Sequence, residues 1–276
     1  MGDLTAVESH FRFGENWRSY SRLIDEPRLA QATDDLRRLV GGDLEGRSFL
    51  DIGCGSGLHS AAALRLGARA LTAVDLDPDS VATTRDVLGR LAPGRDWTVE
   101  QRSVFELPAE WAGRFDVTYS WGVLHHTGAM WKAIDAAART VAPGGRFVVA
   151  LYRKTLLCGA WRIEKQWYAK ASPEAQARAR RVYVALFHAL GRLRGIDTKA
   201  YVRDYASSRG MDYLHDVHDW MGGFPYESVT PKEITEFLVA RGFRRERMFV
   251  HGGAIRSTGL FGSGCDEFTF VREGGA

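Results

Sequence analysis

Alternating glycines follow an acidic residue at the end of an apolar run. The run 48–52 contains Asp51, and a helix-forming stretch begins at Ser60. The glycines between them are Gly53, Gly55 and Gly57. Glycines at every second position leave the backbone of a strand-to-helix turn bare, so that a ligand can lie on it beside the helix N-terminus. Dinucleotide-binding turns have the spacing G-x-G-x-x-G. The spacing G-x-G-x-G with an acid beside it disfavours a pyrophosphate and suits a ligand that carries an ammonium group.

Two adjacent histidines provide a group that could accept a proton. His125 and His126 follow the apolar run 115–121, and histidine titrates near neutral pH. A side chain of this kind could act as a general base. The alternative is that His126 only bonds to the backbone of its loop. Glu164, further along the chain, is the next candidate base.

A cluster of acidic residues and histidines lies at positions 212–219. Spacings of three and four residues can bring such groups onto one face of a helix. The candidate ligands of a divalent metal are Asp212, His215 and Asp216. Such a cluster is more often a polar loop that orients its surroundings or contacts a substrate by hydrogen bonds, so the sequence predicts no metal site.

Five segments resemble, in order, the motifs of class I S-adenosylmethionine-dependent methyltransferases. They are the glycine motif 50–57, the acid-ended strand 70–75, the strand 99–104 with residue 105 after it, the strand 115–121 with the histidine loop, and the turn and strand 143–150. Strands alternate with helices through this region, as in a parallel sheet covered on both faces. The resemblance implies an α/β fold with a Rossmann-like, seven-stranded, mostly parallel sheet, helices on both faces, and a helical lid inserted after the fifth strand.

The cofactor implied by this resemblance is S-adenosylmethionine. The residues expected to bind it are Asp51, Gly53, Gly55, Gly57, Asp75, Leu76, Ser103, Val104, Phe105 and Ser120. Asp75 would bond to the ribose hydroxyls, and residues 103–105 would flank the adenine, although family members often carry Asp where this chain has Ser103. Asp77, directly before Pro78, is the expected cap of the next helix.

The chain divides into four predicted regions. They are an N-terminal helical cap at 1–47, a cofactor-binding core at 48–151, a helical lid for the acceptor at 152–222, and a last helix with two C-terminal antiparallel strands at 223–276. Thr230 is expected to cap a helix over 231–242. The last strands are expected at 244–251 and 267–271.

The lid differs from the core in its charge and aromatic content. Residues 151–220 contain 13 Lys and Arg against 7 Asp and Glu, in a chain whose net charge is +3. Five of these arginines, 178, 180, 181, 192 and 194, either form a solvated helix face or, with Arg153 and Lys154, hold an anionic group. The side chains expected to contact the acceptor are Trp17, Tyr20, Tyr152, Arg153, Trp161, His215 and Trp220.

A narrower resemblance covers nearly the whole chain. Segments 13–17, 119–128 and 218–227 look like a bacterial subgroup similar to ubiquinone-pathway methylases, often found in polysaccharide and natural-product pathways. It implies methyl transfer to a sugar or natural-product hydroxyl. The alternative is magnesium-dependent C-methylation of an isoprenyl diphosphate, with lid arginines on the phosphates. The alternatives to a methyltransferase are an NAD-type oxidoreductase and a non-catalytic module that only binds the cofactor.

Composition limits the partners and the compartment. The 276 residues are 45% hydrophobic, which suffices for one core and an appended subdomain. We expect no membrane span, no secretory signal and, with three widely spaced cysteines, no disulfide framework. The protein is therefore predicted to be cytoplasmic. The expected partner is a small-molecule acceptor, anionic if the lid arginines bind it. Nucleic acid is not expected as a substrate because residues 120–123 lack the motif that holds a flipped base. The sequence is compatible with a homodimer.

Overall fold

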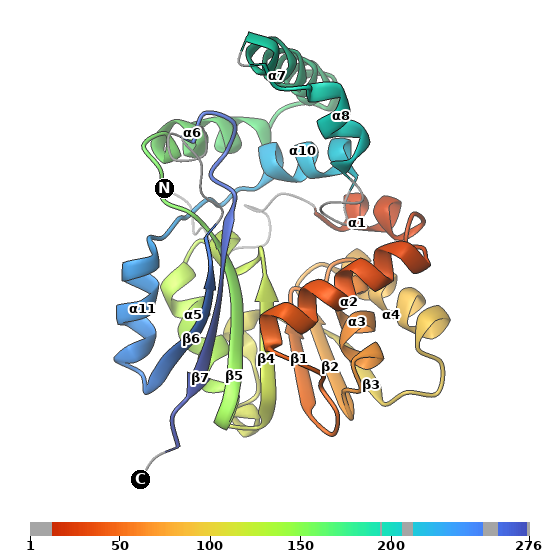
Figure 1. Ribbon diagram of the computed structural model, residues 1–276, viewed down its shortest axis with the longest axis vertical. Coiled ribbons are helices and arrows are strands. Elements are labelled where there is room, and N and C mark those ends of the chain that lie inside the picture. Colours follow the sequence, from red (N-terminus) through yellow and green to blue (C-terminus); the bar gives the residue numbers. More distant parts are fainter. Residues whose placement is uncertain (1–12, 194, 206–211, 251–258, 275–276) are drawn as a thin grey trace.

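One sheet of seven strands organises the chain, in the order β3-β2-β1-β4-β5-β7-β6. The computed structural model describes residues 13–193, 195–205, 212–250 and 259–274. The parallel strands are β1 (Ser48–Ile52), β2 (Ala70–Asp75), β3 (Trp97–Gln101), β4 (Phe115–Trp121) and β5 (Val141–Tyr152). β7 (Cys265–Arg272) runs antiparallel to both β5 and β6 (Phe243–Phe249). The predicted mostly parallel sheet with an antiparallel C-terminal pair is confirmed (Figure 1).

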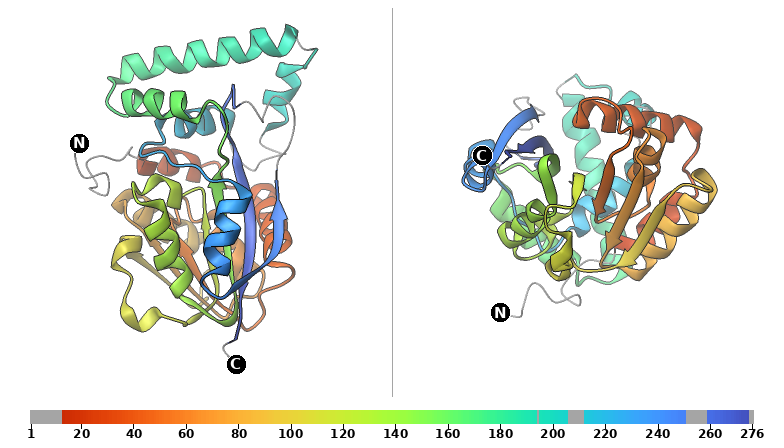
Figure 2. Two further views of the ribbon diagram at one scale, coloured as in Figure 1. Left: turned by 90° about the vertical axis from the view of Figure 1, so that its left-hand side faces the viewer. Right: turned by 90° about the horizontal axis from the view of Figure 1, so that it is seen from below.

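Helices cover both faces of the sheet (Figures 1 and 2). One face is covered by α2 (Glu26–Val40), α3 (Leu58–Arg65) and α4 (Pro78–Leu91), and the other by α5 (Met130–Arg139) and α11 (Pro231–Val239). Successive strand residues point to opposite faces. Phe49 therefore belongs to the core under α2 and α3, whereas Leu50 packs in the core under α5 and α11. Two hydrophobic cores thus fix the strand ends from both sides.

Capping residues place the starts of two helices where the sequence predicts them. The Asp77 carboxylate accepts a hydrogen bond from the Asp79 amide at the start of α4. Thr230 and Glu233 form a reciprocal capping box at the start of α11. α11 ends at Val239, before the predicted stop at Gly242.

The structure shifts three predicted strand boundaries. β3 ends at Gln101, so that residues 103 and 104 lie outside it, around the short helix η2 (Val104–Glu106). β6 spans 243–249, and the predicted end of this strand at His251 lies outside the described residues. β7 begins at Cys265, two residues before the prediction. The other short helices are η3 (Ala109–Trp111) and η4 (Leu124–His126).

The lid, residues 152–222, lies over the carboxyl ends of the parallel strands (Figures 1 and 2). It contains α6 (Cys158–Tyr168), α7 (Pro173–Leu193), α8 (Thr198–Arg203) and α10 (Tyr213–Gly222). Tyr168, Tyr205 and Tyr213 form a small core of its own with Val217 and Met221. The helix α1 (Phe13–Ser21) contacts both α4 and α10, and therefore joins the lid to the sheet.

No helix in the described part of the chain is both long and apolar enough to cross a membrane.

Candidate active site

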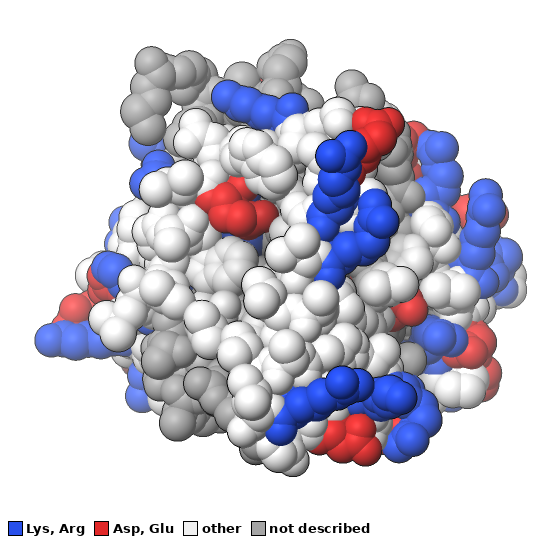
Figure 3. Space-filling view, turned by 90° about the horizontal axis from the view of Figure 1, so that it is seen from above, with Lys and Arg blue, Asp and Glu red and all other residues white. Residues whose placement is uncertain are grey.

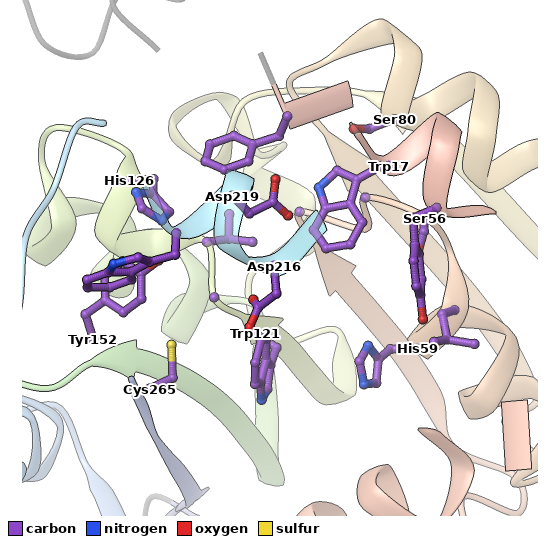
Figure 4. A pocket seen from close by; sticks show the side chains of 18 of the residues that line it. Trp17, Ser56, His59, Ser80, Trp121, His126, Tyr152, Asp216, Asp219 and Cys265 are labelled. Carbon is purple, nitrogen blue, oxygen red and sulfur yellow. The ribbon is translucent and has the colours of Figure 1, made fainter. Parts of the chain in front are cut away.

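A cavity of about 1390 Å³ separates the sheet from the lid. Its floor is the glycine turn after β1 and the ends of β2 and β4, and α1 and α10 form its sides (Figure 4). Aromatic side chains line it from the lid: Tyr183, Phe187, Tyr201, Tyr205, Tyr213 and Trp220. Because crevices at the carboxyl ends of parallel strands are the usual ligand sites of open α/β sheets, this cavity is the candidate active site.

Each glycine of the turn is required by a close neighbour. A Cβ at Gly55 would lie 3.3 Å from the indole of Trp17, which covers the turn. A Cβ at Gly57 would lie 3.0 Å from the Cα of Thr84 on α4, and its φ of 77° also favours glycine. Gly53 and Gly55 line the cavity, whereas Gly57 serves the packing of α3 against α4.

Asp51 joins the strand before this turn to the helix after it. Its buried carboxylate accepts a hydrogen bond of 2.6 Å from the Ser60 hydroxyl on α3. Burial raises the pKa of Asp51 to about 7. Asp51 is not among the residues that line the cavity, so the structure places it as a group that holds β1 and α3 together.

Asp75 ends β2 at the edge of the cavity. Its two carboxylate oxygens accept hydrogen bonds of 3.0 Å from the amides of Gly55 and Asp77. Burial raises the pKa of Asp75 to about 6. The carboxylate is therefore held in place between the glycine turn and the start of α4.

The loop after β3 provides one wall of the same region. Leu76, Ser103, Val104 and Phe105 all line the cavity. The Ser103 hydroxyl accepts a hydrogen bond of 3.2 Å from the Phe105 amide, which fixes the turn. The side chain of Phe105 is 38% exposed and can cover a flat ligand.

Ser120 does not reach the cavity. Its buried hydroxyl donates a hydrogen bond of 2.9 Å to the Ile52 carbonyl and so joins β4 to β1.

The two histidines after β4 differ in their surroundings. His125 is fully buried outside the cavity lining, and its Nδ1 accepts a hydrogen bond from the Tyr152 amide. Burial lowers its pKa well below the usual value. His126 lines the cavity, and its Nδ1 lies 2.7 Å from the Pro225 carbonyl. A carbonyl only accepts, so Nδ1 of His126 carries the proton and Nε2 is the basic nitrogen. The structure therefore retains His126 as a candidate base and corrects the prediction for His125.

Residues 50–149 match a family model described as a methyltransferase domain. The ubiquinone biosynthesis O-methyltransferase of Xanthomonas oryzae pv. oryzae (strain PXO99A) is 37% identical over 113 residues. This alignment covers 41% of the chain and 46% of the relative, so the chain spans less than half the length of that protein. The core of this chain belongs to the class I S-adenosylmethionine-dependent methyltransferases.

Solved structures extend the likeness of fold to about nine tenths of the chain. The magnesium protoporphyrin IX methyltransferase of Synechocystis PCC 6803, with bound S-adenosylhomocysteine, has a TM-score of 0.53 and 17% identity, covering 90% of this chain and 84% of that one. The (4+2)-cyclase SpnF has a TM-score of 0.54 and 14% identity, covering 89% and 81%. These identities establish the fold and not the reaction.

Four of the predicted acceptor contacts line the cavity: Trp17, Tyr20, Tyr152 and Trp220. Three others do not. The Arg153 guanidinium pairs with the buried Asp266 carboxylate, the Trp161 indole donates a hydrogen bond of 2.6 Å to the Gly259 carbonyl, and His215 lies between Asp212 and Ser19. Arg153 is thereby corrected from an acceptor contact to a link between the ends of β5 and β7.

Glu164 is on α6, outside the cavity lining. Within the described residues its carboxylate oxygens have no hydrogen-bond partner, and burial raises its pKa. The neighbouring Lys165 is fully buried, and its Nζ lies 3.6 Å from the ring centroid of Trp220. Glu164 has no described contact with the cavity, so its predicted role as a base finds no support there.

The predicted metal candidates are used in other contacts. Asp212 caps α10 by accepting hydrogen bonds from the amides of Leu214 and His215, and it also contacts the His215 ring at 2.8 Å. Asp216 contacts the Tyr205 hydroxyl. Nowhere in the described ranges do three or more His, Cys, Asp or Glu side chains come together as a metal site.

Sequence reasoning did not single out Asp219 or Asn16 as site residues. The Asn16 amide on α1 donates a hydrogen bond of 2.7 Å to the Asp219 carboxylate on α10, and Asp219 lines the cavity. Asp219 was visible within the acidic cluster, and the spacing of 213, 216 and 219 was the available signal. Its partner is 203 residues away in the chain, which no local pattern reveals.

Proposed function

We propose that this protein is a methyltransferase that transfers a methyl group from S-adenosylmethionine to a hydroxyl of a small-molecule acceptor. The observation that carries the proposal is that one cavity joins the glycine turn and Asp75 to His126 and the aromatic side chains of the lid. Such a cavity can hold a cofactor and an acceptor side by side, which is the main requirement of methyl transfer.

The residues present suit the cofactor. The side-chain-free backbone at Gly53 and Gly55 gives room for a ligand beside the N-terminus of α3, and Asp75 offers a fixed carboxylate to hydroxyl groups. Leu76, Val104 and Phe105 offer apolar contact for a flat base. When bound, S-adenosylmethionine supplies an activated methyl group. We assign Trp17 to covering the turn and excluding water from it.

His126 is the proposed base. The Pro225 carbonyl fixes the protonated Nδ1, so that Nε2 can accept the proton of the acceptor hydroxyl as the new oxygen–carbon bond forms. O-methylation is also the activity named for the Xanthomonas oryzae relative. A sugar or natural-product hydroxyl remains the proposed target, and a cytoplasmic location remains a prediction.

The isoprenyl diphosphate alternative has less support. Arg178, Arg181 and Arg192 are exposed on α7, and none of them lines the cavity. Figure 3 shows Lys and Arg side chains scattered over the largely uncharged outer face on the lid side. The exposure of these three arginines supports the interpretation of α7 as a solvated helix face. Arg194 lies outside the described residues.

Two measurements test the proposed function. Calorimetry with S-adenosylhomocysteine should give one binding site per chain, and NADH, used as the matched competitor, should not bind. Incubation with methyl-labelled S-adenosylmethionine and a panel of phenols and sugars should label a product. His126→Asn should lower kcat by about 10² to 10⁴ with the cofactor affinity unchanged. Binding without transfer to any hydroxyl compound would favour a different reaction on this fold, and absence of binding would refute the proposal.

A further inference from the structure

One face of α10 presents polar groups to the cavity. Tyr213, Asp216, Asp219 and Trp220 recur at helical spacing, and all four line the cavity. Three of their polar atoms are buried without a hydrogen-bond partner in the ranges that the structure describes: the Tyr213 hydroxyl, Oδ2 of Asp219 and Nε1 of Trp220. Buried polar atoms are normally paired, and an unmade hydrogen bond costs about 1 to 3 kcal/mol. Three such atoms on one helix face indicate a ligand that pairs with them.

Asp219 is the most strongly constrained of these groups. Its side chain is buried, with 8% of the residue exposed. Oδ1 is held by the Asn16 amide at 2.7 Å, which leaves Oδ2 as the unpaired oxygen of a residue that lines the cavity. Figure 4 shows the carboxylate between His126 and Trp17, the residue that covers the glycine turn. It therefore stands between the proposed cofactor site and the proposed base.

The charge of this region disfavours an anion. On the lid side of the cavity the described charged side chains are the carboxylates of Asp216 and Asp219. Among the described lining residues the cations are Arg38 and Arg102, which pair with Glu267 and Glu100. Arg180, the half-buried arginine of α7, is engaged by the Tyr168 hydroxyl and the His218 ring. A phosphate placed against α10 would therefore meet the Asp216 carboxylate without a compensating cation among the described lining residues.

A hydroxyl group can pair with Asp219 and with one of the two unpaired donors on the same helix. It can donate to Oδ2 of Asp219, and it can accept from the Trp220 indole N–H or the Tyr213 hydroxyl. It also suits Asp219 in either protonation state, since a protonated carboxyl group can donate to a hydroxyl oxygen. The aromatic side chains opposite, among them Phe187 at 6.1 Å from the Tyr213 ring, suit a flat apolar body.

We infer that the polar face of α10, with Asp219 as its anchor, binds an uncharged hydroxylated aromatic acceptor and rejects phosphorylated ones. This inference rests on the proposed function, because it names the acceptor class of the same cavity. Asn16 is a positioning residue that holds the Asp219 carboxylate through α1.

The test uses the full-length protein saturated with S-adenosylhomocysteine and three fluorinated probes. Fluorine NMR titrations with para-fluorophenol, fluorobenzene and para-fluorophenyl phosphate compare a hydroxyl, no polar group and a phosphate on one ring. We expect para-fluorophenol to bind about tenfold more tightly than fluorobenzene, in line with one well-made buried hydrogen bond. The phosphate should bind less tightly than either.

Variants separate a binding role from a structural one. Asp219→Ala should remove the preference for para-fluorophenol over fluorobenzene, and Asp219→Asn should restore part of it. Asn16→Ala should lower para-fluorophenol affinity less than Asp219→Ala does. Asp212→Asn, an identical change on α10 at a residue outside the cavity lining, should leave all three probes unaffected.

Each other outcome overturns the inference in a distinct way. Equal binding of the phosphate probe would show an anion site. Equal losses in Asn16→Ala and Asp219→Ala would show that the pair is structural. A loss of S-adenosylhomocysteine affinity in Asp219→Ala alone would assign Asp219 to the cofactor. Failure of wild type to bind S-adenosylhomocysteine would refute the proposed function itself, and is recognised before any probe is added.

Discussion

Asp75 illustrates how one side chain can organise a cofactor site before the cofactor arrives. Its oxygens accept hydrogen bonds from the Gly55 and Asp77 amides, so its orientation is set by the backbone. We predict that Asp75→Ala lowers the affinity for S-adenosylmethionine by roughly 1.5 to 3 kcal/mol, the usual contribution of a hydrogen bond to a charged group. Calorimetry on the folded variant measures this, with Asp86→Ala, at an exposed position of α4 outside the cavity lining, as the control. An unchanged affinity would place the ribose contact elsewhere.

Lys165 provides a second prediction at the scale of one residue. It is fully buried, its Nζ has no hydrogen-bond partner within the described residues, and burial lowers its pKa. A lysine with a lowered pKa in the folded state binds its proton more readily when unfolded. Its contribution therefore favours unfolding at low pH, and this effect fades as the pH rises toward the pKa of about 10.4 in the unfolded chain.

Lys165→Met should therefore raise the free energy of unfolding at pH 7 by about 1 to 2 kcal/mol, and by less at pH 9.5. Urea unfolding at both pH values measures the difference between variant and wild type. Lys199→Met, on the exposed side of α8, is the matched control. A variant that is less stable than wild type at pH 7 would show that the contact with the Trp220 ring outweighs the cost of burial.

At this scale the sequence predicted the residues that share a local motif. The positions of Asp75, Asp77 and His126 follow from a strand end, a proline and a loop, which are patterns a few residues long. Arg153 was assigned to the acceptor because nothing near it reveals Asp266, which lies 113 residues further along and pairs with it across the sheet. Asp51 was assigned to the cofactor because the sequence does not show that its carboxylate turns toward Ser60.

At the scale of elements, the start of α11 shows a helix boundary that the sequence determines. The Thr230 hydroxyl accepts from the Glu233 amide at 3.2 Å, and the Glu233 carboxylate accepts from the Thr230 amide at 2.8 Å. These hydrogen bonds, with a further one from Lys154, lower the pKa of Glu233 to about 2. The box thus stabilises the folded state above the usual pKa of glutamate, and the effect is lost as the pH falls toward 2.

Thr230→Ala should lower the free energy of unfolding by about 1 kcal/mol at pH 7, the usual cost of losing such a cap. Urea unfolding at pH 7 and pH 3 measures it, and the loss should be smaller at the lower pH. Thr235→Ala, within the same helix, is the control. A pH-independent loss would show that the hydrogen bond from the Thr230 hydroxyl to the Glu233 carboxylate contributes little.

Several elements of the core could be predicted because they carry a local signal: α4 and α11 begin at capping residues, and most of the parallel strands are apolar runs. The sequence prediction ended the third strand at residue 104, beyond the observed end of β3 at Gln101, because the polar residues Arg102 and Ser103 indicate neither a strand nor a turn. The lid was predicted as helical, but its arrangement depends on contacts between side chains from separate helices, such as the ring contact of Phe187 on α7 with Tyr201 on α8 at 5.3 Å. Such contacts leave no local signal in the sequence.

At the scale of the whole molecule, α1 connects the two sides of the cavity. Trp17 covers Gly55 in the core, and the neighbouring Asn16 donates to Asp219 and to the His215 carbonyl in the lid. A ligand that fixes the glycine turn should therefore stabilise α1 and, through it, α10. The outer helix α7 lies on the side of α10 away from α1 and should respond less (Figure 1).

Hydrogen exchange with and without S-adenosylhomocysteine tests this coupling. Ligand at 100 times its Kd adds about 2.7 kcal/mol to the stability of the state that binds it. We expect slower exchange in the turn 53–57, in α1 and in α10, and little change over residues 178–193 of α7. In Asn16→Ala the protection should persist at the turn and disappear from α10, because the link between the helices is removed. Equal protection of α7 and α10 in wild type would instead mean that the cofactor stabilises the lid as a whole, through the shared cavity and not through α1.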